Sequence, residues 1–355
     1  MKKLFLSGLS LLFLGATLVG CAGNNATTTT STTEVTPTTT TTASEETSTI
    51  TKTTTKVTPT TTTTVAASTS TTVVDEYVLK GIMPGGAPAV AFANYVATTN
   101  TKDNYTVVSD TTLLQQAFAK GEQDIVVAPI NMGANLYSKG KSTYKLASVL
   151  TWGNLYFASQ KEDFALASMN NSPVTFFGEN SINMAIVDYV LEGKSITTGE
   201  RTYLASTSNT QEELLKNPNA IVLIAEPALS AAKTKKTIKS ISVQELYAEL
   251  GGAGSYPQAG LFVSASAVAN HKELVDNLIT GVKSSCDLIK TDLDTSATNA
   301  FAFLGAPGVP VLKNAIPGSN IEFKKASEVK DKINAVANLK LALFGGALPQ
   351  DEFYY

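Results

Sequence analysis

The sequence has very few of the side chains that build metal and catalytic centres: one His and two Cys in 355 residues. A single histidine, His271, excludes a metal site built on two or more imidazoles. A single arginine, Arg201, excludes a guanidinium cluster that could clamp phosphates or several carboxylates at once. No GxSxG segment is present, so the nucleophile elbow of a serine hydrolase is also missing. These absences argue against an enzyme of either kind.

The first 21 residues are typical of a secretory signal peptide. Lys2 and Lys3 precede an apolar run over residues 4–19. The run contains Ser and Gly and is shorter than the roughly 20 residues that span a bilayer, so an uncleaved anchor is the less favoured alternative. The small residues before Cys21 resemble a bacterial lipobox, which implies cleavage after residue 20 and acylation of Cys21 with palmitate-like chains. We predict a signal peptide over residues 1–20 and a membrane anchor on Cys21.

Residues 21–74 are predicted to form a disordered tether. Of the 46 residues from Thr27 to Thr72, 27 are Thr, and almost none is large and apolar. Such a composition cannot build a core, and it also suits O-glycosylation. As a flexible coil, about 50 residues would reach roughly 40 Å. The tether would therefore hold a domain near the membrane and off its surface.

The second cysteine, Cys286, has no partner once Cys21 is acylated, so no internal disulfide is expected. Its surroundings, VKSSCDLIK, have a helical apolar pattern, which favours a buried structural thiol. Loss of Lys2 and Lys3 with the signal peptide leaves 25 basic against 30 acidic residues, a net charge of about −5. Nothing in this balance indicates a nucleic-acid partner.

About 280 residues remain from Asp75, enough for two α/β lobes. The most informative stretch, residues 124–140, reads DIVVAPINMGANLYSKG. Its β-branched run, residues 125–127, suits a strand buried on both faces; Pro129 ends that strand, and a helix follows from Asn131 through Tyr137. Open α/β sheets bind ligands beyond the carboxyl ends of their strands, so residues 128–132 are a candidate pocket wall.

Two later junctions repeat this order. A strand at residues 174–177 leads through a turn at Gly178–Ser181 into a helix at 182–191, and a strand at 220–225 ends at Glu226. We expect the polar residues at Asn131, at Glu179–Ser181 and at Glu226 to converge on one cleft.

The rest of the chain supplies the connections. The β-rich run at residues 145–159 breaks at Trp152-Gly153-Asn154, where we expect the chain to begin leaving lobe one. A strand at residues 260–263 marks the return, and a last long helix is predicted over residues 326–344.

A glycine-rich turn, Pro84-Gly85-Gly86, precedes a predicted helix at residues 87–97. Such a turn presents free backbone N–H groups and the positive end of the helix dipole to a ligand. It is not a dinucleotide fingerprint, because the third glycine is missing. A plain turn without a ligand fits the segment equally well.

Several segments, in the same order along the chain, resemble the substrate-binding lipoproteins of ABC importers, in the group of alkanesulfonate-, taurine- and nitrate-binding and thiamine-pyrimidine-synthesis-like proteins. The matching segments are MPGGAPAVAFANYV, FAKGEQDIVVAP, NMGANLYSKG, VLTWGNLYFAS, IAEPALSAA, SYPQAGLFVS, IPGSNIEF and GGALPQDEFYY.

This resemblance implies a two-lobed α/β fold of the periplasmic-binding-protein type (type II), with two hinge crossovers, over residues 75–355. Lobe one would comprise residues 75–159 and 260–355, and lobe two residues 160–259. A monomer would close on a small organic ligand, either a thiamine-precursor-like heteroaromatic compound or a sulfonate- or nitrate-like anion, and deliver it to an ABC permease and its ATPase. The scarcity of Arg departs from members that hold anions with Arg.

Twelve residues are candidates for ligand contact, and several have a structural alternative. Glu226 could pair with a ligand cation or an aminopyrimidine donor, or it could serve the dipole of the next helix. Asn180 and Ser181 could simply cap a helix. Trp152 and Tyr256 could stack on a planar ligand or belong to the core. Amides can donate and accept together. The candidates are Gly86, Ala87, Asn131, Met132, Trp152, Asn154, Glu179, Asn180, Ser181, Glu226, Tyr256 and Gln258.

No catalytic residue, cofactor or metal is expected, because capture needs no covalent step. Two other classes of function stay open. A secreted hydrolase would require an acid–base pair that the sequence does not display. A surface adhesin fits the Thr-rich stalk but not three convergent strand ends.

Overall fold

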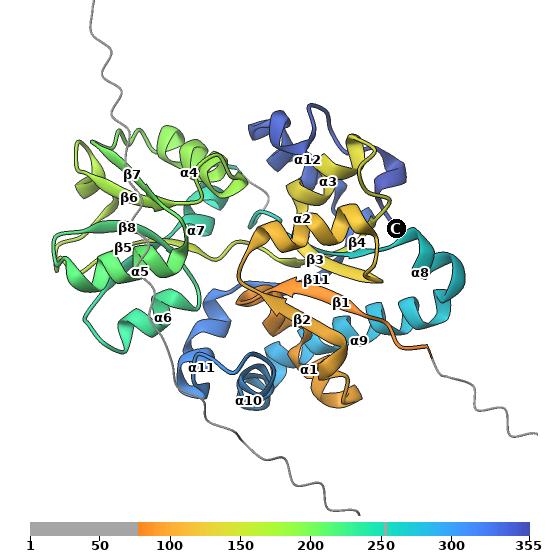
Figure 1. Ribbon diagram of the computed structural model, residues 1–355. Coiled ribbons are helices and arrows are strands. Elements are labelled where there is room, and N and C mark those ends of the chain that lie inside the picture. The colour runs from red at the N-terminus through yellow and green to blue at the C-terminus, as the bar shows by residue number, and fades with distance from the viewer. Residues whose placement is uncertain (1–76, 252–253) are drawn as a thin grey trace, which may run out of the picture. The chain divides into compact units, whose positions relative to one another are not determined.

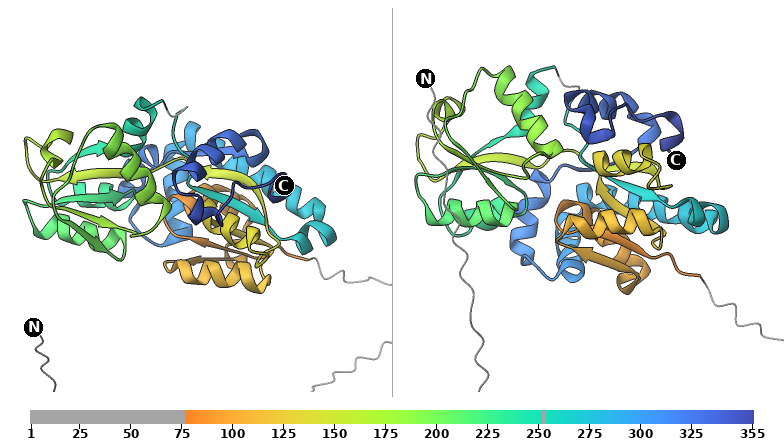
Figure 2. Two further views of the ribbon diagram at one scale, coloured as in Figure 1. Left: turned by 90° about the horizontal axis from the view of Figure 1, so that it is seen from above. Right: turned by 45° about the horizontal axis from the view of Figure 1, so that its top comes forward.

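The computed structural model describes residues 77–251 and 254–355 and places them in one compact unit (Figures 1 and 2). The predicted signal peptide, the acylated Cys21 and the tether over residues 21–74 lie outside the described residues. Two β-sheets, each covered by helices on both faces, organise this unit. We call each sheet with its helices a lobe.

The sheet of the first lobe has the strand order β11-β4-β10-β3-β1-β2. Strands β2 and β3 run parallel to β1, whereas β10 is antiparallel to both β3 and β4, and β11 is antiparallel to β4. The central β10 therefore joins two groups of strands into one sheet. The strands are β1 (Gly81–Pro84), β2 (Tyr105–Val108), β3 (Ile125–Pro129), β4 (Lys145–Thr151), β10 (Ala259–Val263) and β11 (Ile321–Lys325).

Helices cover both faces of this sheet, because successive side chains of its strands point to opposite faces and both sets are apolar. Ile125 and Val127 pack with α1, α9 and α10, whereas Val126 and Ala128 pack with α2, α3 and α12. The helices are α1 (Ala87–Thr99), α2 (Thr111–Lys120), α3 (Ile130–Ser138), α8 (Ala265–Asn270), α9 (Lys272–Thr291), α10 (Leu293–Leu304), α11 (Val309–Gly318) and α12 (Lys330–Leu339).

The second lobe repeats the arrangement with the strand order β7-β6-β8-β5-β9. Helices α4 and α7 pack on one face and α5 and α6 on the other. The strands are β5 (Leu155–Ser159), β6 (Val174–Phe177), β7 (Arg201–Leu204), β8 (Ile221–Ala225) and β9 (Lys239–Ser242), and the helices are α4 (Ile182–Gly193), α5 (Thr207–Lys216), α6 (Ala228–Lys233) and α7 (Val243–Glu249).

Two crossovers join the lobes. Residues 152–154 lead from β4 to β5, and the chain returns between α7 and β10. Each crossover delivers a strand into the interior of the next sheet: β5 lies between β8 and β9, and β10 lies between β3 and β4. One cluster of buried apolar side chains extends from sheet to sheet and includes Trp152, Leu155 and Tyr256. The crossovers are therefore packed and not merely exposed linkers.

The strand and helix predicted around Pro129 are confirmed, as are those flanking Gly178–Ser181. The predicted boundary between the lobes at residue 159 is five residues late. Leu155–Ser159 pairs with β8 and β9, so it belongs to the second sheet. The predicted bend at Gly153 is itself the crossover, and this glycine has a left-handed φ of 85°. The predicted lobe two also ends one residue late, since Ala259 already pairs with Pro129 of the first sheet.

The predicted helix over residues 326–344 is in fact three pieces: a 3-10 turn at Ala326–Glu328, α12, and a second 3-10 turn at Leu341–Phe344. The break after α12 has a tertiary cause. Asn135 of α3 places its Nδ2 3.3 Å and 3.4 Å from the carbonyl oxygens of Ala342 and Leu343. This side chain satisfies acceptors that a continuous helix would have used internally.

The predicted buried thiol is confirmed: Cys286 is free and fully buried on α9. Burial raises the pKa of this thiol to about 12, which keeps it protonated and unreactive near neutral pH. Within the described ranges, no helix combines the length and the apolar character required to cross a membrane.

Candidate functional site

Loops at the carboxyl ends of parallel strands from both lobes meet. In the first lobe, β1 ends at Gly85-Gly86 and α1 begins at Ala87, which is buried. In the second lobe, β8 ends at Glu226-Pro227. A Cβ added at Gly86 would lie 3.6 Å from Cδ of Pro227, so the two loops are in contact. Gly86 has a φ of 80°, which favours glycine at this contact.

Gln258, in the second crossover, connects three elements. Its N–H donates to the carbonyl oxygen of Thr151 (2.9 Å), and its own carbonyl oxygen accepts from the N–H of Ile130 (3.1 Å). Its side-chain Nε2 donates to Oδ1 of Asn183 on α4, at 3.2 Å. Gln258 therefore bonds β4 and α3 of the first lobe through its backbone and the second lobe through its amide.

Asn131 lies in the same place. Asn131, Gln258 and Ile182 line a recess between α3, α4 and α12 that is too narrow to admit a water molecule. The buried Oδ1 of Asn131 has no hydrogen-bond partner among the residues that the structure describes. Met132, the next residue, is half-buried. The lobes are thus closed against each other here, with one amide oxygen free to accept a hydrogen bond.

Glu226 is only 7 % exposed, although its side chain is ionisable. Its carboxylate oxygens accept from the N–H of Ser230 (3.0 Å) and from the hydroxyl of Ser230 (2.9 Å), in the first turn of α6. Burial raises the pKa of Glu226, and the two hydrogen bonds from Ser230 oppose that rise only in part. The capping alternative is therefore present in the structure, and the carboxylate still has lone pairs for a ligand donor.

Asn154, in the first crossover, holds the backbone of Glu226. Its Nδ2 donates to the carbonyl oxygen of Glu226 (3.2 Å), and its own carbonyl oxygen accepts from the N–H of Glu226 (3.1 Å). Tyr156, on β5, donates its hydroxyl to the carbonyl oxygen of Gly318 (2.8 Å), at the end of α11. This second hydrogen bond again connects the two lobes. Burial, followed by the charge of Glu226, raises the pKa of Tyr156 to about 12.

We expect the free energy of unfolding to decrease as pH rises from about 4.5, the ordinary pKa of Glu226, through its raised folded-state pKa. In that interval the native protein keeps a proton that the unfolded chain has released, so folding loses stability with increasing pH. The change Glu226→Gln should remove this component, since an amide does not titrate. Urea unfolding of both proteins over a pH series measures it, and equal pH dependence in the two would contradict the assignment.

The turn after β6 shows less of a site than the sequence suggested. Glu179 and Asn180 are exposed, and Asn180 has a φ of 59°, as expected for an Asn in a turn. Ser181 caps α4, its hydroxyl accepting from the N–H of Met184 at 3.4 Å. The residue of this junction that reaches the other lobe is Asn183, which the sequence analysis missed. Its position, two residues after the cap, carried no signal that distinguished it from any other helical Asn.

The two aromatic candidates lie in the buried layer between the crossovers. Tyr256 is fully buried, and its ring packs edge-on against Tyr247 at 5.4 Å. Trp152 is 6 % exposed, and its indole N–H donates to the carbonyl oxygen of Glu322 at 2.8 Å. Neither ring lines the recess of Asn131 and Gln258. This placement corresponds to the core alternative for both rings.

The candidates therefore fall into two groups at the junction of the lobes. Gly86 and Asn154 meet Glu226-Pro227, and Asn131 lies with Gln258 and Asn183. Amide, carboxylate and backbone N–H groups of this kind bind and orient a ligand. Within residues 77–251 and 254–355, no group of three or more His, Cys, Asp or Glu side chains could hold a metal ion.

No protein-family model matches the sequence, and no curated protein matches it by sequence. Solved structures do match. An ABC transporter protein from Parabacteroides distasonis superposes with a TM-score of 0.67 at 21% identity, over 78% of this chain and 98% of that one. The periplasmic aliphatic sulphonate binding protein SsuA from Escherichia coli gives a TM-score of 0.61 at 10% identity, over 78% and 91%.

A third match is the Candida albicans CA3427 gene product, described as having the generic periplasmic binding protein structural fold. Its TM-score is 0.52 at 11% identity, over 78% of this chain and 93% of that one. All three identities are low, so the matches bear on the fold alone. Together with the two sheets and their crossovers, they show that the chain has the two-lobed fold of the periplasmic binding proteins.

Proposed function

We propose that this protein is an extracytoplasmic solute-binding protein that captures a small organic ligand between its lobes and delivers it to an ABC permease and its ATPase. The observation that carries the proposal is the meeting of strand ends from both sheets. Gly86 contacts Pro227, and Gln258 bonds Asn183 across the lobes. Ligands of open α/β sheets bind at this edge.

The mechanism is capture without reaction. The two crossovers act as hinges, and the closed arrangement described above is one of two states. A ligand that contacts both lobes binds the closed state more tightly and so shifts the population towards it. A monomer suffices for this, because both halves of the site come from one chain.

The charge of the site favours a neutral or cationic ligand, such as an aminopyrimidine-like heteroaromatic compound, over a sulfonate or nitrate. Glu226 is the buried ionisable group at the lobe junction, and the candidates around it are amides and glycine. The only arginine, Arg201, lies elsewhere, on β7, where it pairs with Asp188 at 2.6 Å. An anion would meet an acidic side chain without a guanidinium to offset it.

The change Glu226→Gln should weaken an amine-bearing ligand by roughly 1.5–3 kcal/mol while the protein still folds, because a charge-assisted hydrogen bond is lost at nearly constant volume. Glu179→Gln is the matched control, since Glu179 is exposed at another strand end. Calorimetric titration with a 4-aminopyrimidine of both variants and the wild type measures the difference. An unchanged dissociation constant in Glu226→Gln would leave Glu226 as a helix cap only.

A thermal-shift screen tests the function itself. Thiamine precursors, sulfonates, nitrate and heteroaromatic metabolites are added in turn, because a ligand that binds only the folded state raises its melting temperature. A clear upward shift with one class supports the proposal and names the class. Turnover of esters or phosphates would instead support a hydrolase, and attachment to cells an adhesin.

The proposal includes export and anchoring. A signal peptide over residues 1–20, an acylated Cys21 and a tether over residues 21–74 would hold the binding domain, residues 75–355, at the outer side of the cell membrane. The supporting observations are the lipobox-like residues before Cys21 and the Thr-rich composition. Replacement of Cys21 by Ala should release the protein into the medium, and retention in the membrane fraction would contradict the anchor.

A further inference from the structure

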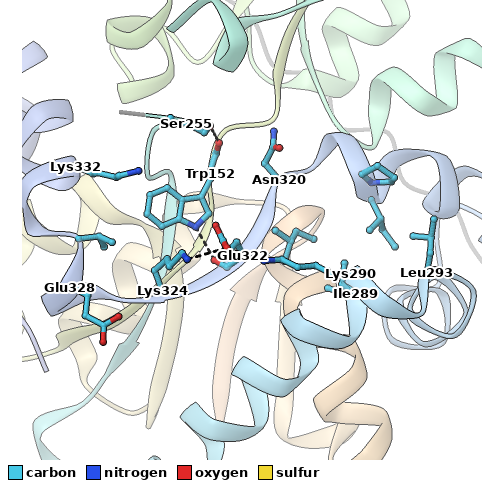
Figure 3. A pocket seen from close by; sticks show the side chains of 15 residues that line it. Trp152, Ser255, Ile289, Lys290, Leu293, Asn320, Glu322, Lys324, Glu328 and Lys332 are labelled. Carbon is cyan, nitrogen blue, oxygen red and sulfur yellow. Dashed lines mark hydrogen bonds and ion pairs between the residues drawn. The ribbon is translucent and has the colours of Figure 1, made fainter. Parts of the chain in front are cut away.

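A groove of about 870 Å³ lies on the first lobe beside the crossovers (Figure 3). Its walls come from both crossovers, the end of α9, the start of α10, the end of α11, the edge strand β11 and the start of α12. It shares no lining residue with the recess of Asn131 and Gln258. Ligand pockets typically enclose 300–1,000 Å³, so the groove is large enough for a small organic molecule.

One part of the groove is apolar and fixed. Trp152 stands in its middle in Figure 3, and the indole is held by the hydrogen bond to the carbonyl oxygen of Glu322 (2.8 Å). The hydroxyl of Ser255 donates to the carbonyl oxygen of Trp152, which ties the two crossovers together beneath the ring. Ile289 and Ile316 add aliphatic wall. A flat apolar body could pack here without rearranging the wall.

Three lysines from three different elements surround this apolar part: Lys290 from α9, Lys324 from β11 and Lys332 from α12. Oε1 of Glu322 accepts from both Lys290 (2.9 Å) and Lys324 (3.2 Å), so one carboxylate is shared by two ammonium groups. Nζ of Lys332 lies 5.5 Å from the centroid of the Trp152 ring. Glu328 is the only other acid in the lining, which leaves one net positive charge.

We propose that this groove is a second binding site, for an aromatic organic anion with a single negative charge. The aromatic body would pack on Trp152 and the isoleucines, and the carboxylate would bind between Lys324 and Lys332, which lie to one side of the ring in Figure 3. A single charge matches the net charge of the lining. Hydrogen bonds between ammonium and carboxylate are stronger than neutral ones, so the charge should contribute measurably to affinity.

The test uses 1-naphthoate, with 1-naphthamide as a neutral compound of nearly the same shape. Because Trp152 is the only tryptophan, its emission reports directly on this groove. We expect 1-naphthoate to change that emission and to bind about tenfold more tightly than 1-naphthamide in calorimetric titrations, the size expected of one charge-assisted contact. The double change Lys324→Gln with Lys332→Gln should weaken 1-naphthoate about tenfold and 1-naphthamide by less than about twofold.

The matched control removes two lysines that do not line the groove, Lys216→Gln with Lys283→Gln; both are exposed and paired with an acid one turn away. This control changes the net charge equally and should leave both affinities unaltered. The proposal is overturned if 1-naphthoate does not bind, if it binds equally well to the Lys324/Lys332 variant, or if the control variant loses affinity to the same extent. Circular dichroism of each variant verifies the fold before titration.

Discussion

The change Gly153→Ala is expected to destabilise the protein by about 2–5 kcal/mol. Gly153 has a φ of 85°, a left-handed conformation that costs a residue with a Cβ about 1–2 kcal/mol. The added methyl group would also lie 2.6 Å from the ring of Tyr256. That ring is fully buried and cannot turn aside, so overpacking adds about 1–3 kcal/mol.

Gly140→Ala is the control for the backbone component alone. Gly140 also has a left-handed φ, 64°, but no atom lies within 4 Å of an added Cβ. It should therefore lose only about 1–2 kcal/mol. Urea unfolding of the two variants and the wild type gives the comparison. If Gly153→Ala loses no more stability than Gly140→Ala, the packing of the crossover against Tyr256 is not as described.

The change Gly318→Ala is expected to open the lobes and to weaken a ligand held between them by about tenfold to a hundredfold. An added Cβ would lie 2.7 Å from the hydroxyl oxygen of Tyr156, which donates to the carbonyl oxygen of the same glycine. It would also lie 3.4 Å from Cγ of Glu226. Separation of the lobes relieves this crowding, whose cost of about 1–3 kcal/mol then counts against the closed state.

Gly308→Ala is the control within the same helix, because an added Cβ there meets only Cδ of Pro310, at an ordinary 3.8 Å. Small-angle scattering of the unliganded proteins should show a larger radius for Gly318→Ala and none of this for Gly308→Ala. Calorimetry with the compound found in the thermal-shift screen supplies the affinities. Equal radii and equal dissociation constants in the two variants would show that Gly318 does not control closure.

The elements that frame the site could be predicted from sequence because their signals are local. The β-branched run Ile125–Val127, ended by Pro129, can only be a short buried strand followed by a turn, and the structure has both. Pieces such as β9 and β11 gave no such signal. The sequences KSIS and IEFKK are short and largely polar, and they become strands only because an edge of a formed sheet is available to pair with them.

The contacts between lobes could not be predicted in this way. Gln258 and Asn183 are 75 residues apart, and nothing near either residue indicates the other. Trp152 illustrates the same limit. Its place at a break in a β-rich run was visible in the sequence, whereas the direction of its indole, towards the carbonyl oxygen of Glu322, depends on a strand that arrives 170 residues later.

The position of β10 in the first sheet determines the order in which the chain can fold. Without it, β3 and β4 have no neighbour in common and the first sheet is divided in two. The second sheet uses strands from Leu155 to Ser242 alone, so its pairings close shorter loops. We therefore expect the second lobe to form first, during synthesis or refolding, and to act as the template on which the strands of the first lobe are brought together.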